Sequence, residues 1–214
     1  TLYAQSHWDA ITNQWQLIEK EEFDYDVNGN LTQYIYYSVG EYDVCLPRNK
    51  EEFTYNSNGD KTLYIGYSWN ETTNQWQPSS KSEYTYDSNG KNTLYIHYHW
   101  NETTSQWQPI EKEVNNYDEH GNITEYSHYY WYSVSNEWRL HYRDEFTFDE
   151  IGNETQHIYY EIDEITGICN PIYKYEYIID GNINKDYIIY YYSINTGQWV
   201  PYYRKYCTYN GLIL

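Results

Sequence analysis

A tandem repeat of about 31 residues runs through the chain of 214 residues and constrains the fold more than any other feature. One position in each copy, called here the anchor position, holds Trp or Cys: Trp15, Cys45, Trp76, Trp107, Trp138, Cys169 and Trp199. Successive anchor positions are 30 or 31 residues apart. Repetition at a fixed period of this length indicates an array of similar supersecondary units. We therefore expect a single repeat array of seven copies, at approximately residues 1–30, 31–60, 61–91, 92–122, 123–153, 154–183 and 184–214.

Each copy contains two runs of residues that favour β-strands. The first run, for example Leu63 to Trp69, is rich in Tyr, Ile and Trp, and the second, Gln75 to Tyr86, alternates more clearly. A polar turn joins the two runs, and a turn such as Asp87 to Gly90 follows the second. No stretch shows a helical period of useful length. We therefore predict an all-β fold, an antiparallel meander of seven tandem β-hairpin repeats with about two strands each.

The sequence leaves the arrangement of the sheet open. Aromatic residues make up 21% of the chain, which argues against disorder. One copy cannot bury its own aromatic face, so neighbouring copies must stack against one another. We expect an open, curved or spiralling repeat sheet. A single curved layer, a spiral shell and a sandwich all remain possible arrangements.

Aligned copies form columns of like residues. Five residues after each anchor position lies a base: Lys20, Lys50, Lys81, Lys112, Arg143, Lys174 and Arg204. Two residues further on, five copies have Glu: Glu22, Glu52, Glu83, Glu145 and Glu176. The first strands carry a column of tyrosines: Tyr36, Tyr67, Tyr98, Tyr129, Tyr160 and Tyr190. We expect the basic and acidic columns to pair between strands as a solvated salt-bridge ladder rather than to form an anion site.

Four copies carry two tryptophans seven residues apart across the polar turn. These candidate ligand-binding residues are Trp8 and Trp15, Trp69 and Trp76, Trp100 and Trp107, and Trp131 and Trp138. The spacing can bring two indoles together across a hairpin, close to its loop end. Two readings remain open. The pairs are either platforms on which sugar rings stack, or cross-strand aromatic clamps that lock the hairpins.

Charge and hydropathy exclude several partners. The chain has 32 acidic residues against 13 basic ones and a net charge of -19, so we expect no nucleic-acid partner. No run of about 18 apolar residues exists, so we expect no membrane insertion. The chain begins at Thr1 without a signal peptide, and we interpret it as a mature product or a fragment of something longer.

The sequence predicts neither a catalytic site nor a metal site, and we expect no enzymatic activity. A catalytic site is normally a singular departure from a repeat, and no nucleophile with its base stands out. The segment Asp24 to Gly29 has the ligand types of the first half of a calcium loop. Ile35 stands where the bidentate Glu of such a loop would be. We therefore expect no cofactor, with calcium at the Asp-x-Asn-Gly turns as the alternative to plain hydrogen-bonded turns.

Three segments resemble a known repeat family: EFDYDVNGNLT (Glu22 to Thr32), EYTYDSNG (Glu83 to Gly90) and EFTFDEIGNET (Glu145 to Thr155). They are similar to the YD repeats of bacterial RHS proteins and teneurins, β-hairpin repeats that build spiralling shells and surface structures. The whole repeat also looks like the tandem repeats of large secreted surface proteins of Bacteroidota, which commonly leave the cell through type IX secretion. The resemblance implies a secreted or cell-surface, extracellular location.

Together these features predict a non-enzymatic extracellular structural or adhesive repeat protein, a self-assembling fibre or surface-array subunit. Its partners would be further copies of itself or other surface proteins. The candidate assembly residues are Leu212, Ile213 and Leu214, the hydrophobic start of a further strand that could pair with the edge of another sheet. The alternative is a glycan-binding module that uses exposed Trp and Tyr platforms.

Overall fold

A computed structural model describes residues 1–39, 44–163, 166–180 and 184–206. Within these residues it contains fourteen β-strands and no helix. The strands are β1 (Leu2–Asp9), β2 (Gln14–Tyr25), β3 (Leu31–Val39), β4 (Cys45–Tyr55), β5 (Lys61–Asn70), β6 (Gln75–Tyr86), β7 (Asn92–Asn101), β8 (Gln106–Tyr117), β9 (Ile123–Tyr132), β10 (Glu137–Phe148), β11 (Glu154–Ile162), β12 (Cys169–Asp180), β13 (Asn184–Ser193) and β14 (Gln198–Lys205). None of the described segments is a helix long and apolar enough to cross a membrane.

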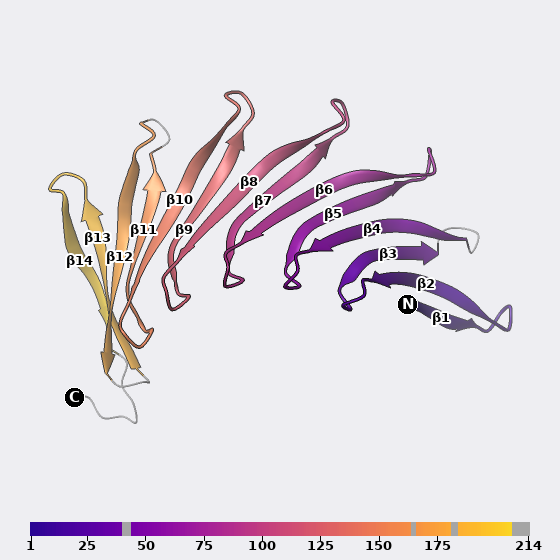
Figure 1. The fold of residues 1–214 in the computed structure, drawn as a ribbon, viewed down its shortest axis with the longest axis horizontal. Helices are drawn as coiled ribbons and strands as arrows, with labels where there is room; N and C mark the ends of the chain where they lie inside the picture. Colours follow the sequence, from indigo (N-terminus) through magenta and orange to yellow (C-terminus); the bar gives the residue numbers. More distant parts are fainter. Residues whose placement is uncertain (40–43, 164–165, 181–183, 207–214) are drawn as a thin grey trace. The chain divides into compact units, whose positions relative to one another are not determined.

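The strands follow one another in the sheet in the order of the sequence, each hydrogen-bonded to the next (Figure 1). Neighbouring strands run antiparallel, for example β5 with β6 and β9 with β10. The predicted all-β antiparallel meander of hairpins in an open sheet is confirmed. The chain divides into two compact units, Thr1–Ile110 and Glu111–Leu214.

Two kinds of turn end the strands, and each depends on a residue with positive φ. In the turns that join one hairpin to the next, such as residues 26–30, this residue is Gly, for example Gly29 with φ of 88°. Both carboxylate oxygens of Asp26 accept hydrogen bonds from this turn, Oδ1 from the backbone N–H groups of Asn28 and Asn30 and Oδ2 from the Asn30 amide. In the turns within a hairpin, such as residues 71–74, Asn, Ser or Gly takes this position, for example Asn74 with φ of 53°. These local bonds fix where each strand reverses.

A β-bulge in the second strand of the hairpins sets their register. In the β5–β6 hairpin, Gly66 lies opposite Ser80 and Tyr67 lies opposite Pro78, so Ser79 is left without a partner. The same irregularity occurs in the β9–β10 hairpin, between Leu140 and Tyr142. A bulge of this kind shifts the residues on one side of it by one position relative to the partner strand. The side-chain columns therefore depend on bulges as well as on the repeat length.

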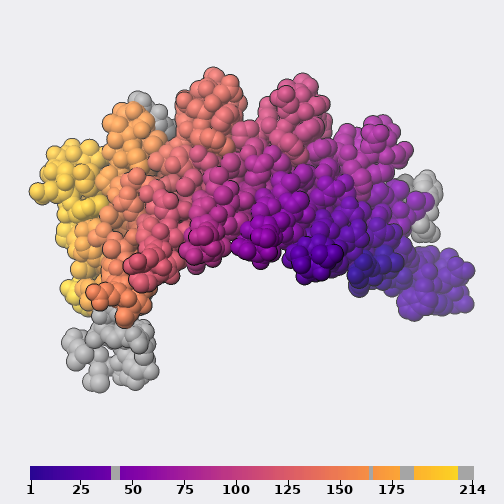
Figure 2. Space-filling view, viewed as in Figure 1, coloured from indigo at the N-terminus to yellow at the C-terminus, as the bar shows by residue number. Residues whose placement is uncertain are grey.

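The sheet is a single layer without an apolar core. Among the described residues, no hydrophobic side chain is buried. The buried polar or charged residues in this part of the chain are Ser82, Ser127 and His128. The accessible surface of the chain is 14422 Å². A compact monomer of 26.2 kDa would expose about 10,600 Å². Figure 2 shows side chains covering the visible face. The two faces of the sheet are therefore solvent-facing surfaces, and stability resides in contacts along them.

Candidate functional site

The register sorts the columns onto two faces of the sheet. Tyr67 lies opposite Lys50 and Pro78, and Trp69 lies opposite Trp76, so these side chains share one face, called here the Trp face. Tyr64, three residues before Tyr67, lies opposite Phe53 on the other face. The bases, the glutamates, one tyrosine column and the Trp pairs all belong to the Trp face.

The second copy departs from the predicted tyrosine column. The sequence alignment places Tyr36 in that column, but Tyr37 occupies the position, because it is Tyr37 that lies opposite Lys20. Tyr36 pairs with Glu21 on the other face. The prediction for Tyr36 is therefore wrong by one residue.

Five bases of the column each form a compact cluster with a Tyr and a Glu. In the second copy, the Lys50 ammonium lies 4.0 Å from the ring centroid of Tyr67 and 2.8 Å from a carboxylate oxygen of Glu52. The Tyr67 hydroxyl donates a hydrogen bond of 2.7 Å to the other oxygen of that carboxylate. All three side chains therefore satisfy one another. The base and the Glu lie on the same strand, two residues apart, so the predicted pairing between strands is wrong.

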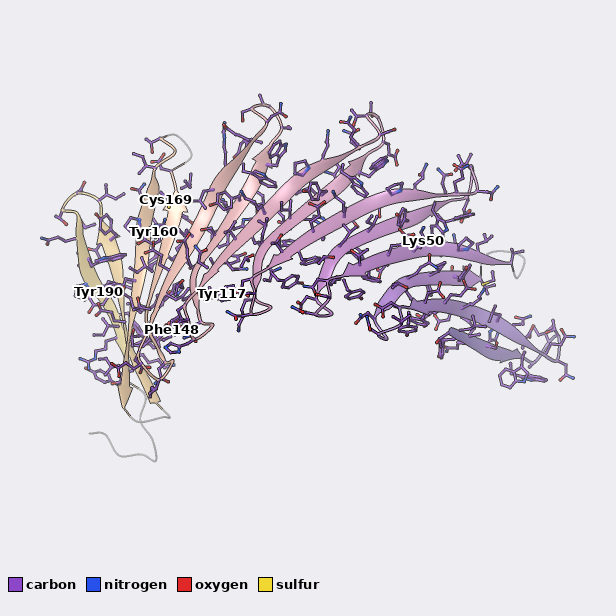
Figure 3. All side chains as sticks on the ribbon, viewed as in Figure 1. Lys50, Tyr117, Phe148, Tyr160, Cys169 and Tyr190 are labelled. Carbon is purple, nitrogen blue, oxygen red and sulfur yellow. The ribbon has the colours of Figure 1, made fainter. Side chains whose placement is uncertain are left out.

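This base–Tyr–Glu cluster recurs in five copies: Lys20–Tyr37–Glu22, Lys50–Tyr67–Glu52, Lys81–Tyr98–Glu83, Arg143–Tyr160–Glu145 and Lys174–Tyr190–Glu176. The base lies 2.5–2.8 Å from the carboxylate. It lies 3.9–4.4 Å from the ring centroid of the Tyr. The hydroxyl of the Tyr donates to the carboxylate at 2.7–2.9 Å. Figure 3 labels Lys50, Tyr160 and Tyr190, which belong to three of these clusters.

The clusters shift the pKa values of their members in opposite directions. The hydrogen bond from Lys20 lowers the pKa of Glu22, and the hydrogen bond from Tyr37 lowers it further against the effect of burial. Burial and the hydrogen bond to Glu22 raise the pKa of Tyr37 to about 12. At neutral pH the cluster therefore holds an ionised carboxylate beside a neutral phenol.

The fourth copy lacks the acidic member of the cluster. Lys112 lies 4.2 Å from the ring centroid of Tyr129, as in the other copies. Val114 stands where the Glu would be. Burial lowers the pKa of Lys112. The sequence shows this departure, because the Glu column has only five members.

The structure brings the two members of each predicted Trp pair together. The ring centroids of the four pairs are 5.0–5.5 Å apart, and the rings meet edge to face at 71–73°. Trp8 and Trp15 are 48% and 69% exposed, whereas the members of the other three pairs are half-buried. Edge-to-face contacts of this kind stabilise a hairpin. The first pair thus offers more ring surface to a ligand than the others.

Two further features of the Trp pairs were missed by the sequence reasoning. Tyr192 and Trp199 form the same edge-to-face pair, with centroids 5.2 Å apart. Their spacing of seven residues is the signal that could have identified them. In several copies a base also reaches the Trp of a later strand, as Lys50 does at 5.8 Å from the Trp76 ring. The Trp pairs are therefore joined to the base–Tyr–Glu clusters.

The opposite face of the second unit carries a histidine cluster. His128 is buried, its Nε2 lies 3.4 Å from a carboxylate oxygen of Glu111, and its ring stacks on Tyr142. The exposed His141 lies beside it, with ring centroids 6.0 Å apart. Within the described ranges, no group of three or more His, Cys, Asp or Glu side chains is placed to hold a metal ion.

An open groove lies beside this cluster in the second unit. Its lining includes Tyr130, Tyr132, Arg139, His141 and Glu161. The guanidinium of Arg139 lies 4.2 Å from the centroid of the Tyr132 ring. The groove is therefore bordered by ring surface and by charges of both signs.

The candidate assembly residues Leu212, Ile213 and Leu214 lie outside the described residues. Cys45 and Cys169 are free thiols at anchor positions, and Figure 3 labels Cys169. Burial raises the pKa of the Cys169 thiol.

Several solved structures from Bacteroidales resemble the chain, each with low sequence identity. A protein of unknown function from Bacteroides fragilis matches at 18% identity over 62% of this chain and 93% of its own, with a TM-score of 0.48. A DUF3836 family protein from Bacteroides vulgatus matches at 20% identity over 43% of this chain and 90% of its own, with a TM-score of 0.37. Another from Parabacteroides distasonis matches at 17% identity over 41% and 78%, with a TM-score of 0.34. No family model and no curated protein matches the chain.

Proposed function

We propose that the chain is a non-enzymatic structural or adhesive repeat segment that acts outside the cell. The observation that carries this proposal is the single-layer sheet, in which no described hydrophobic side chain is buried and the same clusters recur from copy to copy. An array stabilised by contacts between neighbouring copies can be lengthened without rebuilding a core. It also presents two aromatic surfaces to other molecules.

The resemblance to YD repeats and to secreted surface proteins of Bacteroidota supports the extracellular part of this proposal. The segments that carry the resemblance, such as Glu22 to Thr32, contain the second half of a hairpin and its Asp–Gly turn. In RHS proteins and teneurins, repeats of this kind form surface structures. We assign the chain the same type of role, with further copies or other surface proteins as its partners.

The adhesive role is tested with beads coated with the purified chain, under flow over slides coated with the same chain or with serum albumin. We expect beads to be retained on slides coated with the chain and released from albumin. Equal retention on both slides would contradict a specific adhesive role. The self-assembling form is tested by electron microscopy and sedimentation over a concentration series. Deleting Leu212 to Leu214 is expected to abolish end-to-end association, and assembly of the shortened chain would refute the role of these residues.

A second candidate function is glycan binding by the first Trp pair. The observation that favours it is the exposure of Trp15, which is 69% and leaves a ring face open beside Trp8. Neutral sugars stack on exposed rings of this type. We expect oligosaccharides to quench Trp fluorescence, and Trp15→Ala to remove the effect without unfolding the chain. Trp76→Phe is the matched control, because Trp76 is half-buried. Quenching that persists in Trp15→Ala would refute this candidate.

A further inference from the structure

The fourth copy keeps two of the three members of the base–Tyr–Glu cluster. Lys112 lies directly opposite Tyr129, and its ammonium lies 4.2 Å from the centroid of that ring. The corresponding distances in the five complete clusters are 3.9–4.4 Å. The basic and aromatic members therefore have the same arrangement with and without the carboxylate.

No protein carboxylate completes this cluster. The five complete clusters have a carboxylate 2.5–2.8 Å from the base, whereas none lies within ion-pair distance of Lys112 in the described part of the chain. The side chain of Val114 ends at its Cγ methyl groups, one bond short of the carboxylate carbon of a Glu and two bonds short of its oxygens. The hydroxyl of Tyr129 likewise has no acceptor among the described residues, although its counterparts donate to Glu.

The place where the carboxylate would lie is reached by solvent. In the five complete clusters, the side chain of the Glu is 36–43% exposed. Val114 is shorter than Glu, so it leaves at least as much room. A dissolved carboxylate can therefore approach the Lys112 ammonium and the Tyr129 hydroxyl from the Trp face. Charged hydrogen bonds from such donors are among the stronger ones in proteins.

A second substitution in the same row replaces an apolar residue by a polar one. Ser127 lies opposite both Val114 and Arg143 and occupies the column that holds Ile in most other copies, such as Ile65. Ser127 is 1% exposed, and its hydroxyl donates to Glu125. The guanidinium of Arg143 binds Glu145, but its buried Nε–H has no hydrogen-bond acceptor in the described chain. Within the described part of the chain, the row from Val114 to Arg143 thus loses an acid and an apolar residue of the regular pattern together.

Ring surface borders the same position. Lys112 lies 5.1 Å from the centroid of the Trp138 ring, and Trp138 meets Trp131 edge to face. Aromatic rings beside a few polar groups are the usual lining of a site for a small ligand. A sugar acid matches both parts, because it joins a carboxylate to a ring that can stack.

We propose that Lys112 and Tyr129 form a binding site for the carboxylate of a sugar acid of the uronic type, with Trp138 against the sugar ring. The ligand carboxylate takes the place that Glu holds in five other copies. The site is distinct from Trp8 and Trp15, so the failure of neutral sugars to bind there leaves it unaffected. It is equally independent of self-assembly.

The test is a titration followed by NMR, with glucuronate, glucose and acetate as probes. We expect glucuronate to shift the backbone amides of residues 112–114 and 127–129 and the indole N–H of Trp138. Glucose is expected to leave these signals unchanged, and acetate to shift them only at much higher concentration. Shifts caused by glucose as large as those caused by glucuronate would overturn carboxylate recognition. Equal affinity for acetate and glucuronate would overturn the assignment to a sugar acid.

The decisive variant is Val114→Glu, which restores the acidic member of the cluster. Five copies already carry Glu at this position, so the variant is expected to fold. Its own carboxylate should occupy Lys112 and Tyr129 and weaken glucuronate binding at least tenfold. Lys174→Met, in the complete cluster of the sixth copy, is the matched control and should bind glucuronate at Lys112 as the unchanged chain does. Undiminished binding by folded Val114→Glu, or no shift of the Lys112 region by glucuronate in the unchanged chain, would overturn the proposal.

The reciprocal variant is Glu176→Val, which removes the carboxylate from the cluster of Lys174 and Tyr190. This cluster also has a Trp beside its base, because Lys174 lies 5.5 Å from the centroid of Trp199. We expect a second set of glucuronate shifts around Lys174. If folded Glu176→Val gained no such shifts, recognition by the base and the Tyr would be refuted.

Discussion

Replacing Lys174 and Lys112 by Met should affect stability differently, although both are lysines of the same column and the same unit. Lys174 has an ion pair with Glu176 at 2.6 Å and lies 4.3 Å from the Tyr190 ring. Lys112 has the ring contact without an ion pair. Met keeps most of the apolar stem, so each substitution chiefly removes a charge.

The expected magnitudes follow from these contacts. The Lys174–Glu176 pair is worth about 0.5 kcal/mol, because the Glu176 side chain is 36% exposed and water screens the pair. The contact with the Tyr190 ring adds about 0.5–1 kcal/mol. Lys174→Met should therefore lower the free energy of unfolding by about 1 kcal/mol. Lys112→Met also loses a ring contact, but it removes the cost of burying the ammonium. The two effects offset each other, so the free energy of unfolding should change by about zero.

Urea unfolding followed by far-UV circular dichroism measures this difference. With a slope of about 2–3 kcal/mol per molar urea, 1 kcal/mol moves the midpoint by about 0.3–0.5 M. The slope itself should stay the same in both variants. A loss in Lys112→Met as large as that in Lys174→Met would refute the reasoning, since the ion pair would then contribute nothing.

Three further predictions concern the Trp pairs, the titrating clusters and a close contact. Trp76→Ala should lower the free energy of unfolding by about 2 kcal/mol in urea, about half the loss for a buried Trp. Trp15→Ala should lower the free energy of unfolding by less than about 1 kcal/mol, because Trp15 is 69% exposed. An equal loss in Trp15→Ala and Trp76→Ala would contradict this prediction. The Glu22 carboxyl, with its pKa lowered from 4.5, contributes stability that is lost as pH falls below that value. The Tyr37 phenol, with its pKa raised from 10.0 to about 12, contributes stability that is lost as pH rises above 10. Calorimetry should therefore show the highest melting temperature between these two pH values. A maximum outside this pH range would disprove the role of the clusters. Gly66→Ala should lower the melting temperature, because its Cβ would lie 2.8 Å from the hydroxyl oxygens of both Ser80 and Tyr64. An unchanged melting temperature would show that both side chains move aside freely.

Most of the fold was predictable because residue types a few positions apart identify the repeat and its turns. Asp26 and Gly29 identify a tight turn by residue type alone, and the structure places the hydrogen bonds and the positive φ there. The order of the strands follows from the absence of long connections between them. The edge-to-face Trp pairs were predictable from a spacing of seven residues across a turn.

The register and the side-chain partners were less predictable. Tyr37 rather than Tyr36 faces Lys20, because Lys20 and Lys50 are 30 residues apart rather than 31, and Tyr37 precedes Tyr67 by the same 30 residues. The pairing of Lys50 with Glu52 along one strand follows from their separation of two residues, which places both on one face. We expected cross-strand pairs instead, because neighbouring columns also permit them. The half-burial of Trp76 depends on Lys50 of another strand, a contact that a single copy does not reveal.

Among the described residues, the ring contacts of the basic column from Lys20 to Lys174 point one way along the sheet. Lys50 on β4 reaches forward to Tyr67 on β5 and to Trp76 on β6, and Lys174 on β12 reaches forward to Tyr190 and Trp199. The two sides of a boundary between copies therefore differ: one side carries cations and the other carries aromatic rings. Two boundaries of the same kind would bring cation against cation, whereas unlike boundaries complement each other. Joining two arrays through these residues is thus a head-to-tail process, which has no built-in end point.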